Sequence, residues 1–317
     1  MATIKDIATR CNVSVATVSY AINGLTKNIS PTTKEKILRV CEELDYHPNG
    51  AARNLKRKKT YNIGVFIYDF AGPTFSSILA GINKKLNDAG YTIIVSTGNR
   101  SKQILLEKQV DAAIIFDNKI EDETIIFFAK HSPVVLLDRE LQGKNIFSSL
   151  LNNKEPVYSL IKLLIEKGYH EFGYLSGPSD SYNNNQRFSG FKKALEEYKL
   201  NYTVYQGDFT IQSGYDNGLH ILSKLHPRFI YCANDELAVG LIKAAQELNI
   251  KIPEELGIAG YDNINLCEYV TPKLTTIDVS YYRWGESVSN FLVSFLEDNK
   301  DISLSPTITK IIWRKSC

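Results

Sequence analysis

The sequence predicts a small all-α domain followed by a larger α/β region that folds as two lobes around parallel sheets. Residues 1–47 contain short helical patterns and no convincing strand. Beyond Lys59, continuously apolar runs alternate with amphipathic stretches, as buried parallel strands and their crossover helices do. The alternation occurs in two blocks, at about 61–149 and 150–277. It therefore predicts two open sheets with right-handed crossovers.

Length and charge favour separate modules with different partners. The chain has 317 residues and is 44% hydrophobic, which is enough for two or three domains with sizeable cores. Residues 1–60 hold 11 Lys or Arg against 5 Asp or Glu, whereas the rest of the chain is mildly acidic. The basic first module is expected to face a polyanion.

Cysteine usage and hydropathy predict a soluble protein of the reducing cytoplasm. The N-terminus has no apolar signal region, and no run approaches the roughly 18 apolar residues that would span a bilayer. The five cysteines are odd in number, lack CxxC or CxxxH spacing, and indicate neither a disulfide framework nor a metal site. They are Cys11, Cys41, Cys232, Cys267 and Cys317.

The first 23 residues predict two short helices joined by a tight turn. Asn12 stands where the turn needs a positive φ, and Ser14 is expected to cap the second helix with Thr17 facing its first turn. The helices would pack through small or apolar side chains, namely Ile7, Ala8, Cys11, Val13, Val18 and Ala21. The second helix would then expose Val15, Ala16, Ser19 and Tyr20.

Such a pair is either a DNA-binding helix-turn-helix or an ordinary pair of amphipathic helices. In a helix-turn-helix the exposed second helix reads base edges in the major groove. A third helix is expected after Pro31, and five of the seven residues in 53–59 are basic. A charge run is usually a solvated face, but beside a candidate recognition helix it favours phosphate contact.

The α/β region has regularly spaced elements. Gly90 and Gly168 stand where a glycine would end two amphipathic helices, at 76–90 and 157–168. A short helix (KQILLEKQ) is expected before the run at 111–116, and a last helix near 283–298. The strand-like runs are 62–68, 91–97, 111–116, 133–138, 171–177, 203–207, 228–235, 256–262 and 274–279.

Six motifs are spread over essentially the full length of the chain: TIKDIATRCNVSVATVSYAING, YHPNGAARNLK, GPSDSYNNNQRFSGF, CANDELAVG, GYDN and PKLTTID. Together they resemble the lactose-repressor (LacI/GalR) family. The resemblance implies a DNA-binding transcriptional repressor: a helix-turn-helix headpiece at 1–47, a hinge at 48–60, and a periplasmic-binding-protein-like core at 61–317. The lobes of this core would comprise about 61–149 with 278–306, and about 150–277 with 307–317.

The resemblance also implies which residues contact operator DNA. Val15 and Ala16 match the two principal base-reading positions, and Tyr20 stands where the family usually has Arg or His. Apolar side chains there would contact thymine methyl groups. Positions that contact phosphate or position the headpiece match Ser14, Thr17, Ser19, Asn23, Tyr46 and Asn49. We expect the hinge to become ordered only on DNA and to kink the duplex through the minor groove. The hinge residues that match DNA-contacting positions of the family are Ala52, Leu55 and Lys56.

A small effector, by the same resemblance a sugar or sugar derivative, is expected between the lobes. Arg187, Asn234 and Asp262 carry this expectation because they occur together in their motifs. Each alone is more often a helix cap or a loop ion pair, and the aromatic candidates could be core residues. The remaining candidates are Tyr68, Phe75, Arg100, Asp138, Asn183, Phe209 and Tyr281.

Two features depart from the family pattern. The segment at 97–111 is several residues shorter than usual, which puts one cleft wall and part of the dimer surface in doubt. The chain ends at Cys317 without a leucine-heptad tail, so we expect a homodimer on a pseudo-palindromic operator.

Three other functions compete. An extracytoplasmic sugar-binding protein would share the core, but the basic first module and missing signal argue against it. An enzyme would need a motif such as a P-loop, GxSxG or HExxH, and the sequence contains none. A regulator that needs a corepressor instead of being relieved by a sugar remains open. No cofactor or metal is expected.

Overall fold

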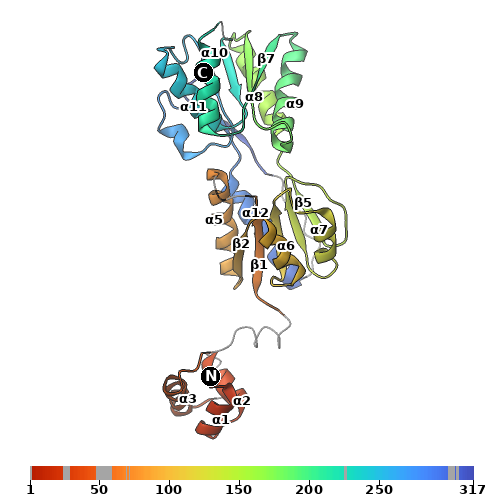
Figure 1. Ribbon diagram of the computed structural model, residues 1–317, viewed down its shortest axis with the longest axis vertical. Coiled ribbons are helices and arrows are strands. Elements are labelled where there is room, and N and C mark those ends of the chain that lie inside the picture. Colours follow the sequence, from red (N-terminus) through yellow and green to blue (C-terminus); the bar gives the residue numbers. More distant parts are fainter. Residues whose placement is uncertain are drawn as a thin grey trace. The chain divides into compact units, whose positions relative to one another are not determined.

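The computed structural model describes residues 2–23, 29–47, 59–68, 70, 72–224, 227–298, 304 and 307–317. The chain divides into two compact units, Met1–Thr60 and Tyr61–Cys317, and Figure 1 labels their elements. Among the described residues, no helix is long and apolar enough to cross a membrane.

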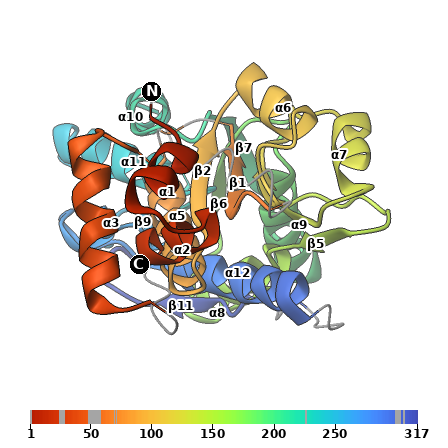
Figure 2. The ribbon, with the colours of Figure 1, turned by 90° about the horizontal axis from the view of Figure 1, so that it is seen from below.

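The first unit, the headpiece, contains three helices: α1 (Ile4–Cys11), α2 (Val15–Ile22) and α3 (Pro31–Glu43), drawn in red to orange in Figure 2. Thr3 and Asp6 form a capping box at the start of α1. Asn12 has φ 55°, so the left-handed turn residue expected from the sequence is confirmed. The side chain of Ser14 accepts a hydrogen bond from the Thr17 N–H, which confirms the cap of α2.

The first lobe of the second unit is built on a five-stranded parallel sheet in the order β2-β1-β3-β4-β5. The strands are β1 (Asn62–Ile67), β2 (Thr92–Ser96), β3 (Ala112–Phe116), β4 (Val134–Leu137) and β5 (Ile146–Ser149). The associated helices are α5 (Pro73–Asp88), α6 (Asn99–Leu106), α7 (Asp122–Ala129) and α12 (Tyr281–Asp298). The expected short helix before β3 is confirmed as α6, which has eight residues.

Strand β5 is missing from the sequence-based expectation. It follows β4 after eight residues without an intervening helix and pairs with it in parallel, from Val134 with Ile146 to Leu137 with Ser149. Only four residues long and half polar, the strand IFSS lacks the continuous apolar run that predicts the other strands of the sheet.

The second lobe has a four-stranded parallel sheet in the order β7-β6-β8-β9. Its strands are β6 (Phe172–Ser176), β7 (Tyr202–Gln206), β8 (Phe229–Cys232) and β9 (Gly257–Ala259). Its helices are α8 (Lys154–Glu166), α9 (Tyr182–Glu197), α10 (Ile211–Leu222) and α11 (Asp235–Glu247), followed by the short 3-10 helix η1 (Asn265–Glu268). The two-sheet architecture predicted from the sequence is confirmed.

A third, two-stranded antiparallel sheet joins β10 (Thr276–Asp278) to β11 (Lys310–Ile312). Beyond β11, the Ser316 hydroxyl donates to the Ile258 carbonyl and accepts from the Thr275 N–H. The chain end is thus fastened to β9 and β10, next to the point where the chain leaves the second lobe for α12.

Helices α5 and α12 pack closely against each other. A Cβ added to Gly285 would lie 2.3 Å from the Ile78 carbonyl oxygen, and one added to Gly81 would lie 2.0 Å from the Tyr282 carbonyl oxygen. Glycine at both positions lets the backbones of α5 and α12 approach, and this contact determines the position of Tyr281 at the first turn of α12.

Candidate functional site

Helix α2 presents a sharply divided surface. Val18 and Ala21 are buried in the headpiece core, whereas Val15 is 41% and Tyr20 46% exposed and Ala16 is exposed as well. A helix whose inner face is packed and whose first turn is capped presents its outer side chains in a fixed orientation. This geometry is what groove readout requires.

The other expected headpiece contacts have mixed surroundings. Ser19 is half-buried, and the Asn23 side-chain amide donates to its carbonyl at the end of α2, 2.7 Å away. Tyr46 is half-buried and packs against the headpiece core. The hinge candidates Asn49, Ala52, Leu55 and Lys56 lie outside the described residues.

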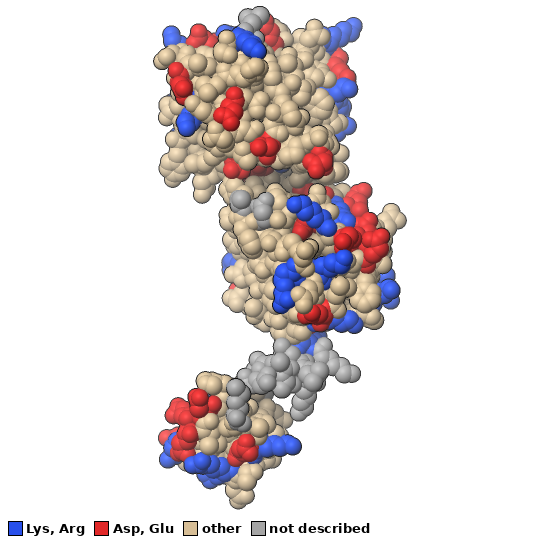
Figure 3. Space-filling model, in the orientation of Figure 1, with Lys and Arg blue, Asp and Glu red and all other residues tan. Residues whose placement is uncertain are grey.

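Charge alone does not distinguish the headpiece surface. Figure 3 shows both basic and acidic side chains on its visible face, and Arg10 pairs with Glu43 at 3.1 Å. Lys36 donates to the Cys11 carbonyl at the end of α1 and so serves partly as a helix C-cap. The described headpiece surface therefore carries both signs of charge, and two of its cations have partners within the headpiece.

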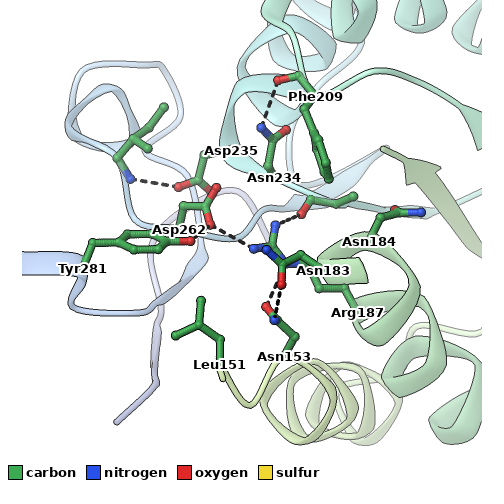
Figure 4. A network of polar contacts seen from close by, with 12 residues as sticks. Leu151, Asn153, Asn183, Asn184, Arg187, Phe209, Asn234, Asp235, Asp262 and Tyr281 are labelled. Atoms are coloured by element: carbon green, nitrogen blue, oxygen red, sulfur yellow. Dashed lines mark hydrogen bonds and ion pairs between the residues drawn. The ribbon is translucent and has the colours of Figure 1, made fainter. Parts of the chain in front are cut away.

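Arg187 is the centre of a polar network in the second unit (Figure 4). Its side chain is 4% exposed, and its Nε donates to the Asn153 Oδ1 at 3.1 Å. One terminal nitrogen donates to the Ala233 carbonyl at 2.6 Å, and the other pairs with the Asp262 carboxylate at 3.2 Å. The guanidinium also lies over the Tyr261 ring, 3.8 Å from its centroid.

In the buried Arg187–Asp262 pair, burial and pairing act on the two pKa values in opposite directions. Burial lowers the pKa of Arg187, but the Asp262 carboxylate and neighbouring tyrosines outweigh it, so the pKa is raised overall. Burial raises the pKa of Asp262. The Arg187 charge and the hydrogen bond from Tyr281 lower it, but the pKa remains above its ordinary value. The Tyr281 hydroxyl donates to Asp262 at 2.6 Å and thereby ties the first turn of α12 to the second lobe.

Asp138 and Asn183 connect the two lobes directly. Asp138 follows β4 in the first lobe, and its carboxylate accepts from the Asn183 amide at 2.9 Å and from the Leu151 N–H at 3.1 Å. The Asn183 side-chain oxygen Oδ1 in turn accepts from the side-chain amide of Asn153, whose own Oδ1 accepts from Arg187. Burial raises the pKa of Asp138 to about 6.

The aromatic candidates fall into three groups. Tyr68 is 47% exposed and meets the Phe75 ring edge-on at 4.8 Å, but Phe75 itself is only 4% exposed and belongs largely to the core. Phe209 is half-buried with φ 74° and packs on Gly177. Tyr281 is buried beside Asp262.

Asn234 and Arg100 stand apart from the Arg187 network. Asn234 caps α11 by accepting from the Leu237 N–H, and its amide donates to the Phe209 carbonyl, so the capping alternative raised from the sequence applies. Arg100 lies exposed on α6 and hydrogen-bonds Gln103 one turn further along.

Three residues in or beside the Arg187 network are not predicted from the sequence. Asn153 lies at the chain crossing before α8, and Tyr261 precedes Asp262 in the GYDN motif. Asp235, fully buried, accepts from the Thr276 hydroxyl, the Cys267 thiol and the Ile264 N–H. Burial and the nearby Asp262 charge raise its pKa to about 7. The Asn-Asp pair in CANDE was the available signal, but it indicated only a helix cap.

A cleft of about 570 Å³ adjoins this network. Its walls come from the first turn of α5, the start of α11, the segment around η1, and the crossing from β10 into α12. Asp262 and Tyr281 belong to both the network and the cleft wall. In the described part of the chain, no group of three His, Cys, Asp or Glu side chains could hold a metal ion.

Family models match both parts of the chain. The model described as bacterial regulatory proteins of the lacI family matches residues 3–49, and that of a periplasmic binding protein-like domain matches residues 161–317. A curated relative, the HTH-type transcriptional repressor PurR of Escherichia coli O139:H28, is 32% identical over 100% of this chain and 97% of its own length.

Solved structures share the fold. A lac repressor dimer bound to operator and the anti-inducer ONPF has a TM-score of 0.84 at 25% identity, covering 99% of this chain and 98% of that one. A sugar-binding transcriptional regulator of the LacI family from Enterococcus faecalis has a TM-score of 0.73 at 32% identity, covering 81% and 98%.

Proposed function

The chain belongs to the LacI family of bacterial regulatory proteins, and from this we propose that it is a sequence-specific DNA-binding transcriptional repressor, not an enzyme. We propose further that a sugar or sugar derivative, bound between the two lobes, controls its affinity for operator DNA. The observation that carries the proposal is the exposed face of α2 on a helix whose opposite face is packed and whose first turn is capped.

On DNA, α2 would lie in the major groove. Val15 and Ala16 would contact thymine methyl groups, and Tyr20 would reach a base edge or phosphate. Phosphate contacts would come from Ser14, Thr17, Ser19 and Asn23, and hinge residues 48–60 would enter the minor groove.

The effector would bind where the Arg187 network meets the cleft. Arg187, Asp262 and Asp138 supply hydrogen-bonding groups for hydroxyls, and Tyr68 offers an exposed aromatic face. Because Asp138 and Asn183 already join the lobes, a ligand that competes for their hydrogen bonds would change the angle between the lobes. Asn234, Phe209 and Arg100 are the weaker members of the proposed site.

The proposed organisation follows the family pattern. We propose a cytoplasmic homodimer with headpiece 1–47, hinge 48–60 and core 61–317, bound to a pseudo-palindromic operator without a cofactor. The relative crystallised as a dimer on operator supports this assembly.

Selection from a random duplex pool at near-physiological salt tests the DNA function. We expect the full chain to enrich a pseudo-palindromic sequence, and Val15→Ala to alter or relax the base preference at one position in each half-site. Leu38→Ala is the matched control, because Leu38 is similarly exposed, at 40%, but lies on α3. Absence of any enriched sequence with the unmodified chain would refute the proposal.

A further inference from the structure

Strand β7 lies at the edge of the second-lobe sheet, and among the described strands it pairs with β6 alone. Just beyond its last residue, the Gly207 N–H donates to the Ser176 carbonyl of β6 at 2.9 Å. Because alternate residues of a parallel strand bond to the same neighbour, the intervening residues direct their backbone N–H and C=O groups to the outer edge of the sheet. These residues are Tyr202, Val204 and Gln206.

The strand lacks the features that usually protect such an edge. Natural edge strands carry charged side chains, a proline or a bulge that hinders pairing with another chain. Residues 202–206 read YTVYQ, with neither a charge nor a proline, and they pair with β6 in unbroken register. Val204, in the middle of the strand, is 46% exposed. The Asn217 amide donates to the Gln206 carbonyl at 3.2 Å, which leaves that oxygen a second lone pair.

The strand fits an antiparallel copy of itself. With Val204 opposite Val204 of the second copy, Tyr202 stands opposite Gln206, and the outward N–H and C=O groups at these three positions meet in register. Tyr202 packs against the Phe191 ring of α9, with ring centroids 5.6 Å apart. Val204 is two residues further along, so its side chain lies on the same face of the sheet and would be covered by the equivalent valine.

A groove of about 460 Å³ adjoins this strand. In the antiparallel arrangement, the end of the second copy's strand lies beside the start of β7, and Asp208 follows that end by two residues. Lys199 lines the groove, so opposite charges at the two ends of β7 meet across the pair, which favours a second copy as the partner. Glu171, also in the lining, offsets part of this attraction. The apolar and aromatic lining residues are Phe172, Leu200, Tyr202, Tyr205 and Pro227.

We propose that β7 pairs with β7 of a second copy of this chain and thereby joins two four-stranded sheets into one. A single pair of five-residue strands buries less than the roughly 1,200 Å² of a standard stable interface, so the association is weak and depends on concentration. The contact lies outside the headpiece and the Arg187 network. It therefore goes beyond the DNA and effector functions proposed above and depends on neither.

Sedimentation velocity of the full chain, from low micromolar to the highest soluble concentration, tests the inference. We expect the average mass to rise toward twice that of the assembly present at low concentration. Val204→Lys places two like charges opposite each other and should weaken the association about fivefold or more. Val204→Pro removes an outward N–H that β6 does not use, and should abolish the association. Leu163→Lys, at a 39% exposed position on α8 of the same lobe, is the control and should associate like the unmodified chain.

The outcomes separate this inference from the proposed function. An average mass that stays constant over the whole range would overturn the inference, and so would association that both Val204 variants retain, since another surface would then be responsible. Circular dichroism checks that each variant is folded, and if Val204→Pro is not, Val204→Lys carries the test alone. A chain that associates through β7 but selects no operator would refute the proposed function and leave the inference intact.

Discussion

At the scale of single residues, Arg187 and Asp262 form an ion pair that is almost completely removed from solvent. Such a pair contributes little net stability, because the cost of desolvating two charges offsets their attraction. Removing one partner is different, since the remaining charge stays buried without compensation. Arg187 would keep only neutral partners, namely the Asn153 side chain, the Ala233 carbonyl and the Tyr261 ring.

Asp262→Ala is therefore expected to destabilise the second unit by about 3–5 kcal/mol. Asp88→Ala breaks the Lys84–Asp88 pair, which is exposed and screened by solvent, and should leave the unfolding free energy almost unchanged. Urea unfolding followed by tryptophan fluorescence measures both, because the chain's two tryptophans, Trp284 and Trp313, lie in the second unit. If the two variants lost similar amounts of unfolding free energy, burial of the Arg187–Asp262 pair would not explain the effect of Asp262→Ala.

Asp235 predicts a specific pH dependence. Its pKa is raised to about 7, so the folded state holds a proton that the unfolded state, with a pKa near 3.8, releases. Its contribution to stability is therefore most favourable at low pH and is lost as pH rises from about 4 to 7.

Asp235→Asn should remove this dependence. Between pH 5 and 7 we expect the stability of the variant to improve relative to the unmodified chain by about 2 kcal/mol, measured as urea unfolding free energies. Asp88→Asn, at an exposed carboxylate, should show no such change. Stability curves for Asp235→Asn that run parallel to those of the unmodified chain would show that Asp235 is ionised throughout.

Local sequence rules explain some of these residues and miss others. Asn12 and Ser14 act through their immediate neighbours, so turn and cap chemistry predicts them. Asp138, Phe209 and Asp262 have positive φ values of 54°, 74° and 110°, which no local pattern indicates for these residue types. Asn153 and Tyr261 contact Arg187 from distant segments and depend on the folded lobes.

At the scale of elements, hydrophobic periodicity locates most helices and strands, because each buries an apolar face. Strand β5 shows the limit: its four residues carry too few apolar positions to stand out, and its place at the sheet edge depends on pairing with β4. Helix α5 begins at Pro73, three residues before its expected start, where the proline occupies the first turn.

The contact between α5 and α12 gives a prediction at this scale. A Cβ at Gly285 would lie 2.3 Å from the Ile78 carbonyl oxygen, so Gly285→Ala must separate the two helices. We expect a loss of about 1–3 kcal/mol in unfolding free energy, and weaker ligand binding because Tyr281 moves away from Asp262. Asn290→Ala on the exposed side of α12 is the control, and calorimetric unfolding with ligand titration measures both. If Gly285→Ala changed neither the unfolding free energy nor the ligand affinity, the close approach of α5 and α12 would not be needed for stability or for the position of Tyr281.

At the scale of the whole molecule, the chain combines a headpiece and a core as separate compact units. The resemblance and the alternation of strands and helices predict both units, but the hydrogen bonds that connect the lobes become visible only in the folded core. The Asp138–Asn183 contact is one of these, because its residues stand 45 positions apart on different lobes.

This division predicts that DNA selectivity and ligand response can be changed separately. Val15→Ala should alter the preferred operator while leaving the ligand Kd of the free protein unchanged. Asn183→Ala should keep the preferred operator, because Asn183 lies outside the headpiece. The same variant should weaken the ligand response: the factor by which ligand changes operator affinity should fall about fivefold or more, which is within the range of typical allosteric coupling energies. Fluorescence anisotropy with labelled operator, with and without saturating ligand, measures both quantities. If Asn183→Ala left that factor unchanged, the Asp138–Asn183 contact would have no part in the response, and signalling would have to pass through other contacts between the lobes.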